Sequence, residues 1–176
     1  MKKGTFAGKP FWIALIVIAA LIAIDQFIKV WALDNLKNAV EPVQFIKFGS
    51  REIINLTYYE NTGAAFSILE GKLPFLIIVT SLFLLVGIYL LATKRVHQPF
   101  LIGSASLIIA GGMGNLIDRI FRGFVVDYVE VRLFRFAVFN FADCCVVIGA
   151  ILMLFYTLFL DNKKEPKEED SANAPS

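Results

Sequence analysis

The sequence predicts a membrane all-α protein, in which four transmembrane helices carry a small extracytoplasmic β-sheet subdomain. Three observations lead to this fold class. The 176 residues are 57% hydrophobic and only 18% charged, whereas soluble domains contain about 25% charged residues. Four apolar runs are each close to the roughly 20 residues that a helix needs to cross a bilayer. Two longer polar segments between these runs contain β-branched and aromatic residues, which are typical of strands.

The apolar runs cover residues 11–33, 73–92, 99–118 and 137–160. The first run is much longer than the short apolar centre of a cleavable signal peptide, and no polar mature domain follows it. We therefore interpret it as the first permanent span. The remaining three runs make the protein polytopic.

The extracytoplasmic segments are expected at residues 34–72 and 119–136. Within them, residues 43–48 and 53–59 are separated by a Gly-Ser pair, and residues 124–129 form a third strand-like stretch. Alternating side chains in these stretches favour strands. We expect a small sheet that lies at the membrane surface.

Four spans place both termini on one side of the membrane. Basic residues cluster near the span ends on that side, which the positive-inside rule assigns to the cytoplasm: Lys2, Lys3, Lys9, Lys94 and Arg95. We expect residues 1–161 to form a single membrane domain. Residues 162–176 are charged and lack apolar anchors, which predicts a disordered cytoplasmic tail.

Polar residues at membrane depth fall in one layer near the outer face. With a rise of about 1.5 Å per residue, Asp25 lies roughly 20 Å and Lys29 roughly 27 Å along a span that begins at residue 11. Scattered structural residues have no reason to share a depth, whereas the residues of an active site do. The other members of the layer are Asn115, Asp118, Arg119, Asp127, Asn140 and Asp143.

The residue types in this layer favour carboxylate chemistry. His97 is the only histidine and is expected on the cytoplasmic side, so Ser–His and Cys–His mechanisms lack a base at the outer face. Ligands for zinc do not cluster, and we expect no metal and no cofactor. Asp127 and Asp143 can share one proton, so that an ionised aspartate deprotonates water and a neutral one protonates the scissile carbonyl. This pattern predicts peptide hydrolysis by an aspartic mechanism.

Several of these residues also have a purely structural interpretation. Asp25 and Lys29 are spaced i,i+4 on one helix face and can neutralise each other. Asp118 and Arg122 have the same spacing. Arg119 is long enough to extend to lipid headgroups.

The alternative for the two aspartates is an ion pair with a nearby arginine, either Arg119 or Arg132. Asn115 and Asn140 are better suited to donating hydrogen bonds than to transferring protons. At the level of the whole protein, the alternatives are a small membrane carrier that uses carboxylates as an ion relay and a structural scaffold. The clustering of carboxylates at one face and the absence of an internal repeat argue against a carrier.

Glycines recur beside the polar layer. An Asn-Thr-Gly turn at residues 61–63 offers an amide and a permissive glycine, which suits bonding to an extended peptide backbone. Gly111, Gly112 and Gly114 remove side chains from one stretch of the third span. That stretch allows another helix or a substrate to approach closely, and we interpret Gly111 as a packing residue.

Five blocks carry a resemblance to a known family. They are residues 25–29 (DQFIK), 61–66 (NTGAAF), 111–119 (GGMGNLIDR), 125–128 (VVDY) and 139–143 (FNFAD). In this order and on these spans, they resemble the signature blocks of lipoprotein signal peptidase, also called signal peptidase II. The small hydroxyl or alanine that often follows the last block in that family is replaced by a cysteine here.

The resemblance implies a bacterial membrane aspartic endopeptidase with Asp127 and Asp143 as its catalytic residues. It implies removal of the signal peptide from diacylglyceryl-modified prolipoproteins, with the cut before the lipidated cysteine. The implied partners are these precursors, membrane lipids and globomycin-type inhibitors, and no nucleic acid. The implied location is the bacterial cytoplasmic membrane, with the active site near the outer leaflet. Supporting or substrate-contacting positions are Asp25, Lys29, Asn61, Gly63, Asn115, Asp118, Arg119 and Asn140.

Overall fold

The computed structural model describes residues 8–63, 69–93 and 95–160. Over these residues, four helices are long and apolar enough to cross a membrane, and the fourth includes a terminal π-helical turn. The fold class predicted from the sequence is confirmed by these helices and by a small antiparallel sheet. The helices are α1 (Lys9–Leu36), α2 (Leu73–Ala92), α3 (Pro99–Phe121) and α4 (Phe141–Phe155), which continues as η2 (Tyr156–Leu160).

The helices begin where proline favours initiation and expose apolar side chains along their length. Pro10, Pro74 and Pro99 each lie in the first or second helical position, where the missing N–H costs no intrahelical bond. Large apolar side chains face outward, such as Phe27, which is 75% exposed, and Phe83, which is 62% exposed. Hydrocarbon rather than water suits such a surface.

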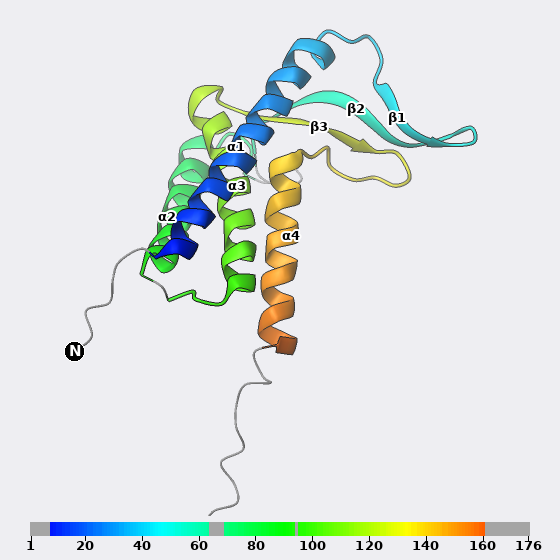
Figure 1. Ribbon diagram of the computed structural model, residues 1–176. Coiled ribbons are helices and arrows are strands. Elements are labelled where there is room, and N and C mark those ends of the chain that lie inside the picture. Colours follow the sequence, from blue (N-terminus) through cyan, green and yellow to red (C-terminus); the bar gives the residue numbers. More distant parts are fainter. Residues whose placement is uncertain (1–7, 64–68, 94, 161–176) are drawn as a thin grey trace, which may run out of the picture.

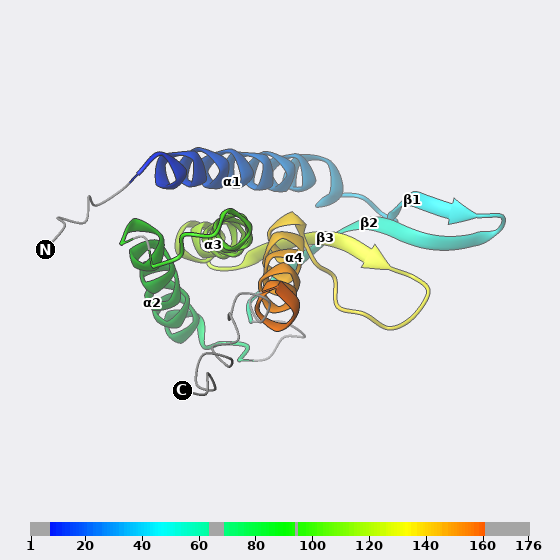
Figure 2. The same cartoon turned by 60° about the horizontal axis from the view of Figure 1, so that its bottom comes forward.

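Helix α3 lies at the centre of the bundle and contacts α1, α2 and α4 (Figure 2). Its glycines permit this packing. A Cβ at Gly111 would collide with the carbonyl oxygen of Ala142 on α4, and a Cβ at Gly112 would lie 2.9 Å from Leu84 on α2. The interpretation of Gly111 as a packing residue is therefore confirmed.

The sheet of the described chain has the order β1–β2–β3 and is antiparallel throughout. Its strands are β1 (Val43–Phe48), β2 (Arg51–Asn61) and β3 (Val125–Val131). Gly49 has a φ of 61° in the turn between β1 and β2, a conformation that favours glycine. Ala32 and Leu36 near the end of α1 pack against Val126 and Tyr128 of β3, which fixes the sheet to the bundle.

The pairing register makes the sheet amphipathic. Residues directly opposite each other share a face. The triplets Val43–Leu56–Val129 and Ile46–Ile54–Val131 are apolar, whereas Gln44–Asn55–Glu130 is polar. Because alternate residues of a strand share a face, Val129 and Val131 lie on the same side of β3 as Asp127.

The sheet lies at one end of the bundle (Figure 1). Helix α1 begins, α2 ends, α3 begins and η2 ends at the opposite end. The fourth helix begins at Phe141 rather than at residue 137, because Phe139 pairs with Val129 as an isolated bridge and Asn140 caps the helix. The predicted tail, Lys2, Lys3, Lys94 and part of the 61–66 block lie outside the described residues.

Candidate active site

Asp127 and Asp143 come from different elements and line the same cavity. Asp127 lies in the middle of β3, and Asp143 lies in the first turn of α4. The cavity has a volume of about 790 Å³ and lies between α2, α3, α4 and the segment that follows β3. Asp127 is only 1% exposed, whereas Asp143 is half-buried. The structure therefore brings together the two aspartates that the sequence singled out.

The cavity combines a few polar groups with an apolar wall. Asn61, Asn115 and Arg119 are among its polar residues. Its wall contains residues that the sequence analysis did not select: Val79, Phe83, Ile108, Phe136 and Val147. They resemble the other apolar residues of the chain, so only the tertiary arrangement distinguishes them.

Three asparagine side chains donate hydrogen bonds to the two carboxyl groups. Asn61 donates to Oδ2 of Asp127 at 2.9 Å, and Asn140 donates to Oδ1 of the same residue at 2.6 Å. Asn115 donates to Oδ1 of Asp143 at 2.8 Å. The predicted donor role of Asn115 and Asn140 is consistent with this geometry.

Burial raises the pKa of Asp127 from its ordinary value of 3.8 to about 7. The donors Asn61 and Asn140 oppose this shift by stabilising the anion, and the negative charge of Asp143 adds to it. Near neutral pH, Asp127 is thus poised between its neutral and ionised forms. Such a carboxyl can hold a proton and can also release one.

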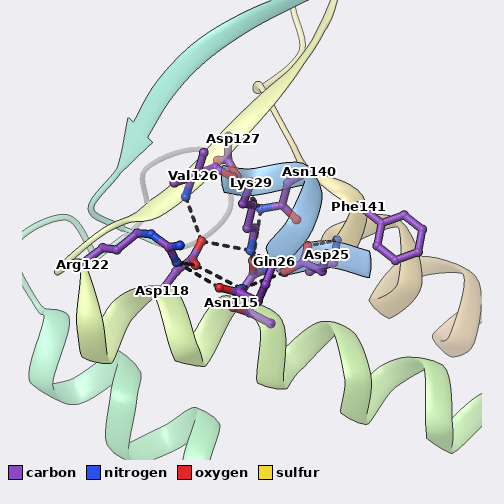
Figure 3. A network of polar contacts seen from close by, with 12 residues as sticks. Asp25, Gln26, Lys29, Asn115, Asp118, Arg122, Val126, Asp127, Asn140 and Phe141 are labelled. Atoms are coloured by element: carbon purple, nitrogen blue, oxygen red, sulfur yellow. Dashed lines mark hydrogen bonds and ion pairs between the residues drawn. The ribbon is translucent and has the colours of Figure 1, made fainter. Parts of the chain in front are cut away.

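A network of buried ions lies beside the two aspartates (Figure 3). Lys29 is 0% exposed, and its Nζ lies 2.9 Å from Asp25 and 3.0 Å from Asp118. Nζ also donates to Oδ1 of Asn115 at 2.9 Å. The predicted i,i+4 pair of Asp25 and Lys29 is present, but it is not self-contained, because Lys29 also binds two residues of α3.

Gln26 and Arg122 complete this network. Gln26 donates to the carbonyl of Gly114 and to Asp118, each at 3.2 Å. Arg122 donates to Gln26 at 3.1 Å and forms the predicted i,i+4 ion pair with Asp118. Gln26 was not among the predicted site residues. The available signal was an amide between Asp25 and Lys29 in an apolar span.

Arg119 points into the protein rather than to lipid headgroups. It donates to the carbonyl oxygen of Gly63 at 2.9 Å, and the N–H of Gly63 donates to Asn61 at 3.0 Å. Its buried Nε has no hydrogen-bond partner among the described residues. Arg119 therefore holds the Asn61–Gly63 turn at the cavity.

The ion-pair alternative for the two aspartates is wrong. In the described part of the chain, neither aspartate lies in an ion pair. Arg132 instead pairs with Glu130 at 2.9 Å and with Glu52 at 3.8 Å. Both carboxyl groups of the cavity thus remain available to other partners.

The four apolar helices are those of a multi-pass membrane protein, and two carboxyl groups that accept hydrogen bonds from asparagine amides line its cavity. The family model described as Signal peptidase (SPase) II matches residues 17–159. The chain belongs to this family and is a membrane peptidase of bacterial type, which favours the enzyme over the carrier and scaffold alternatives.

Relatives and solved structures agree with this assignment. The chain is 42% identical to the lipoprotein signal peptidase of Clostridioides difficile over 149 residues, which cover 85% of this chain and 97% of the relative. It is 38% identical to that of Clostridium acetobutylicum over 156 residues, with 87% and 98% covered. A solved bacterial membrane enzyme superposes with a TM-score of 0.76 at 28% identity, covering 89% of this chain and 93% of that one.

Proposed function

We propose that this protein is an aspartic endopeptidase that removes the signal peptide from diacylglyceryl-modified prolipoproteins, cutting before the lipidated cysteine. Asp127 and Asp143 are its catalytic residues. The observation that carries the proposal is their convergence, from β3 and α4, on one cavity of about 790 Å³. The names of the relatives, lipoprotein signal peptidases, support the substrate class.

The two aspartates have different roles in this mechanism. Asp127 is the acid, because burial raises its pKa to about 7. Asp143, which is more exposed to the cavity, is the base. It takes a proton from water while the water oxygen attacks the scissile carbonyl, and Asp127 protonates the carbonyl oxygen. Collapse of the tetrahedral intermediate breaks the C–N bond. The proton held by Asp143 passes to the leaving amine, and one hydroxyl of the intermediate returns its proton to Asp127 as the carbonyl forms again.

The remainder of the cavity suits an extended apolar peptide. Phe83 and Val147 belong to its apolar wall, while Asn61 and Arg119 offer N–H groups. Burial of apolar side chains against such a wall supplies binding, and a few polar groups fix the orientation of the backbone. Supporting roles for Asp25, Lys29, Gly63, Asn115, Asp118 and Asn140 follow from their contacts with these groups.

The site lies near the outer leaflet in this proposal, and both termini are cytoplasmic. Lys9 begins α1, and Arg95 lies between α2 and α3. These ends of the helices lie opposite the sheet (Figure 1), and the positive-inside rule assigns them to the cytoplasm. The apolar face of the sheet is on the same side as Asp127, which suits contact with the membrane surface. A diacylglyceryl group anchored in the outer leaflet would hold the scissile bond at this depth.

The proposal is tested by cleavage of a diacylglyceryl-modified prolipoprotein in detergent. We expect Asp127→Asn and Asp143→Asn each to abolish cleavage while retaining the thermal unfolding transition of the wild type. The matched control is Asp34→Asn, because Asp34 is an exposed aspartate of α1 and its substitution should leave cleavage unchanged. Cleavage by either cavity variant, or an inactive wild type, would overturn the proposal.

A further inference from the structure

Lys29 is a fully buried cation that does not reach the cavity. It is 0% exposed and does not line the space between the two aspartates. Removing an ammonium group from water is costly, and only well-placed partners offset this cost. Lys29 has three such partners, Asp25, Asn115 and Asp118. These partners in turn contact groups at or next to the two aspartates of the cavity.

Each carboxylate partner of Lys29 accepts a hydrogen bond from the backbone N–H of the residue that directly precedes a catalytic aspartate. Oδ2 of Asp118 accepts the N–H of Val126 at 3.1 Å, and Val126 precedes Asp127. Oδ1 of Asp25 accepts the N–H of Ala142, also at 3.1 Å, and Ala142 precedes Asp143. One ammonium group therefore joins the two anions that place the backbones of the catalytic pair.

The third partner, Asn115, supplies a hydrogen bond to the carboxyl group of Asp143. An ammonium group can only donate, so its contact with Asn115 requires that Oδ1 of the amide face Lys29. Asn140 donates to the same oxygen at 3.1 Å. The NH2 group of Asn115 is thereby directed to Asp143, to which it donates at 2.8 Å. A flipped amide would place two donors against each other.

We propose that Lys29 is the positioning residue of the catalytic pair, acting through Asp118 on Asp127 and through Asp25 and Asn115 on Asp143. This inference rests on the proposed function. Lys29 orients the amide of Asn115 that donates a hydrogen bond to the carboxyl group of Asp143. Its own contacts with substrate are excluded by its burial among α1 and α3.

Asp143 is surrounded by several charged or titratable groups, and the test must separate Lys29 from them. The groups whose charges interact with Asp143 are Asp127 and Tyr128 from β3, Arg119 from α3, and Cys144 from α4. The uncharged donors to its carboxyl group are the side chain of Asn115 and the backbone N–H of Asn140. The variants below leave the four titratable groups unchanged.

The experiment measures kcat and KM for prolipoprotein cleavage as functions of pH. The first variant is Asn115→Leu, which removes the donor to Asp143. The second is the double variant Asp25→Asn with Lys29→Met, which removes one positive and one negative charge together. Lys29→Met alone would leave the buried carboxylate of Asp25 without a cation, whereas Asp118 keeps its ion pair with Arg122. An unpaired buried charge strongly destabilises a fold. In this double variant, the side-chain oxygen of the new amide can still accept the Ala142 N–H.

We expect both variants to lower kcat at least tenfold while KM changes less than threefold. Loss of a donor to a carboxylate disfavours its charged form, so the acid limb of the kcat profile should move to higher pH in both variants. The matched control is Arg122→Gln, which loses an ion pair to Asp118 without touching Asn115 or Asp25. Its acid limb should stay at the wild-type pH even where its thermal stability falls.

Unchanged acid limbs in folded Asn115→Leu and double-variant enzymes would overturn the inference. An acid limb that moves equally in Arg122→Gln would also overturn it, because the effect would then belong to the ion network in general. Both outcomes differ from failure of the proposed function, in which Asp127→Asn or Asp143→Asn would remain active.

Discussion

Asn140 joins the two aspartates of the cavity. Its Nδ2 donates to Asp127 at 2.6 Å, while its Oδ1 accepts the backbone N–H of Asp143 at 2.9 Å. The carboxyl group of Asp143 returns a bond by accepting the N–H of Asn140 at 3.1 Å. This reciprocal pattern is a capping box. The residue that caps α4 therefore also donates a hydrogen bond to Asp127.

Replacement of Asn140 by alanine should therefore affect both stability and activity. We expect a loss of about 1 kcal/mol in the free energy of unfolding from the missing cap and a fall in kcat of about 100-fold from the missing donor. Thermal unfolding and cleavage assays measure the two effects. Asn35→Ala is the control, because Asn35 bonds to Trp31 on an exposed part of α1. Equal activity of the two variants would contradict the role of Asn140.

Activity should have a bell-shaped pH dependence. The alkaline limb reflects loss of the proton from Asp127, whose pKa is about 7. The acid limb reflects loss of the ionised carboxylate that the reaction requires as its base. A close pair titrates as a unit, so both limbs report the pair. Initial rates of cleavage across the pH range measure the profile, and a flat profile across several pH units would argue against the pair.

Stability should also depend on Asp127. Its pKa is raised in the folded protein from 3.8 to about 7, so between these values the folded state binds a proton that the unfolded state has released. Stability from this group is thus fully present below pH 3.8 and is lost as the pH rises to about 7. Thermal unfolding in detergent should show this decline in the wild type, and Asp127→Asn should reduce it. Parallel curves for the two proteins would exclude the predicted shift.

Two glycines of α3 provide a matched test of helix packing. Gly111→Ala places a Cβ against the carbonyl oxygen of Ala142, whereas Gly103→Ala meets no atom within 4 Å. We expect Gly111→Ala to destabilise the protein by about 1–3 kcal/mol. Gly103→Ala should stabilise it by about 0.5 kcal/mol through helix propensity. Unfolding temperatures of the two variants measure the difference, and equal temperatures would show that α4 does not depend on this contact.

The adjacent cysteines should differ in their reactivity toward a maleimide. Cys144 lines the cavity and is half-buried, whereas Cys145 is 4% exposed. We expect labelling of Cys144 first and a loss of cleavage as it proceeds, because the adduct fills the cavity. Mass spectrometry after partial labelling identifies the modified residue, and Cys144→Ala supplies the control. Labelling that inactivates Cys144→Ala equally would assign the effect to another site.

Unlipidated precursor should be a poor substrate. The diacylglyceryl group would hold the scissile peptide bond at the depth of the two aspartates. Without this anchor, the scissile bond is found at that depth less often, and cleavage is slower. Cleavage of lipidated and unlipidated forms of one precursor, at equal concentration in the same detergent, measures the effect. Equal turnover would show that the peptide alone directs binding.

The spans and strands were accessible from the sequence because their signals are local. Hydropathy summed over about 20 residues identifies a span wherever the partners lie, and helix α2 has the predicted bounds. The first strand also coincides with the predicted residues 43–48, because alternation and the following Gly-Ser turn are both contained in a short window. The predicted start of α4 was wrong. Phe139 pairs with Val129 of β3, and the hydropathy of the span gives no signal for a contact with a separate strand.

The candidate site was only partly accessible for the same physical reason. Asp127 and Asp143 stood out because an uncompensated carboxyl at membrane depth is costly, and that cost depends on residue type and depth alone. The partners of Lys29 and the inward orientation of the Arg119 side chain could be identified only from the tertiary structure. A charged group or a donor binds whichever groups the fold brings within about 3 Å, and these can come from any part of the chain. Sequence alone determined which charges enter the membrane. Only the packing of α1 and α4 on α3, with β3 beside them, decided which groups each of them binds.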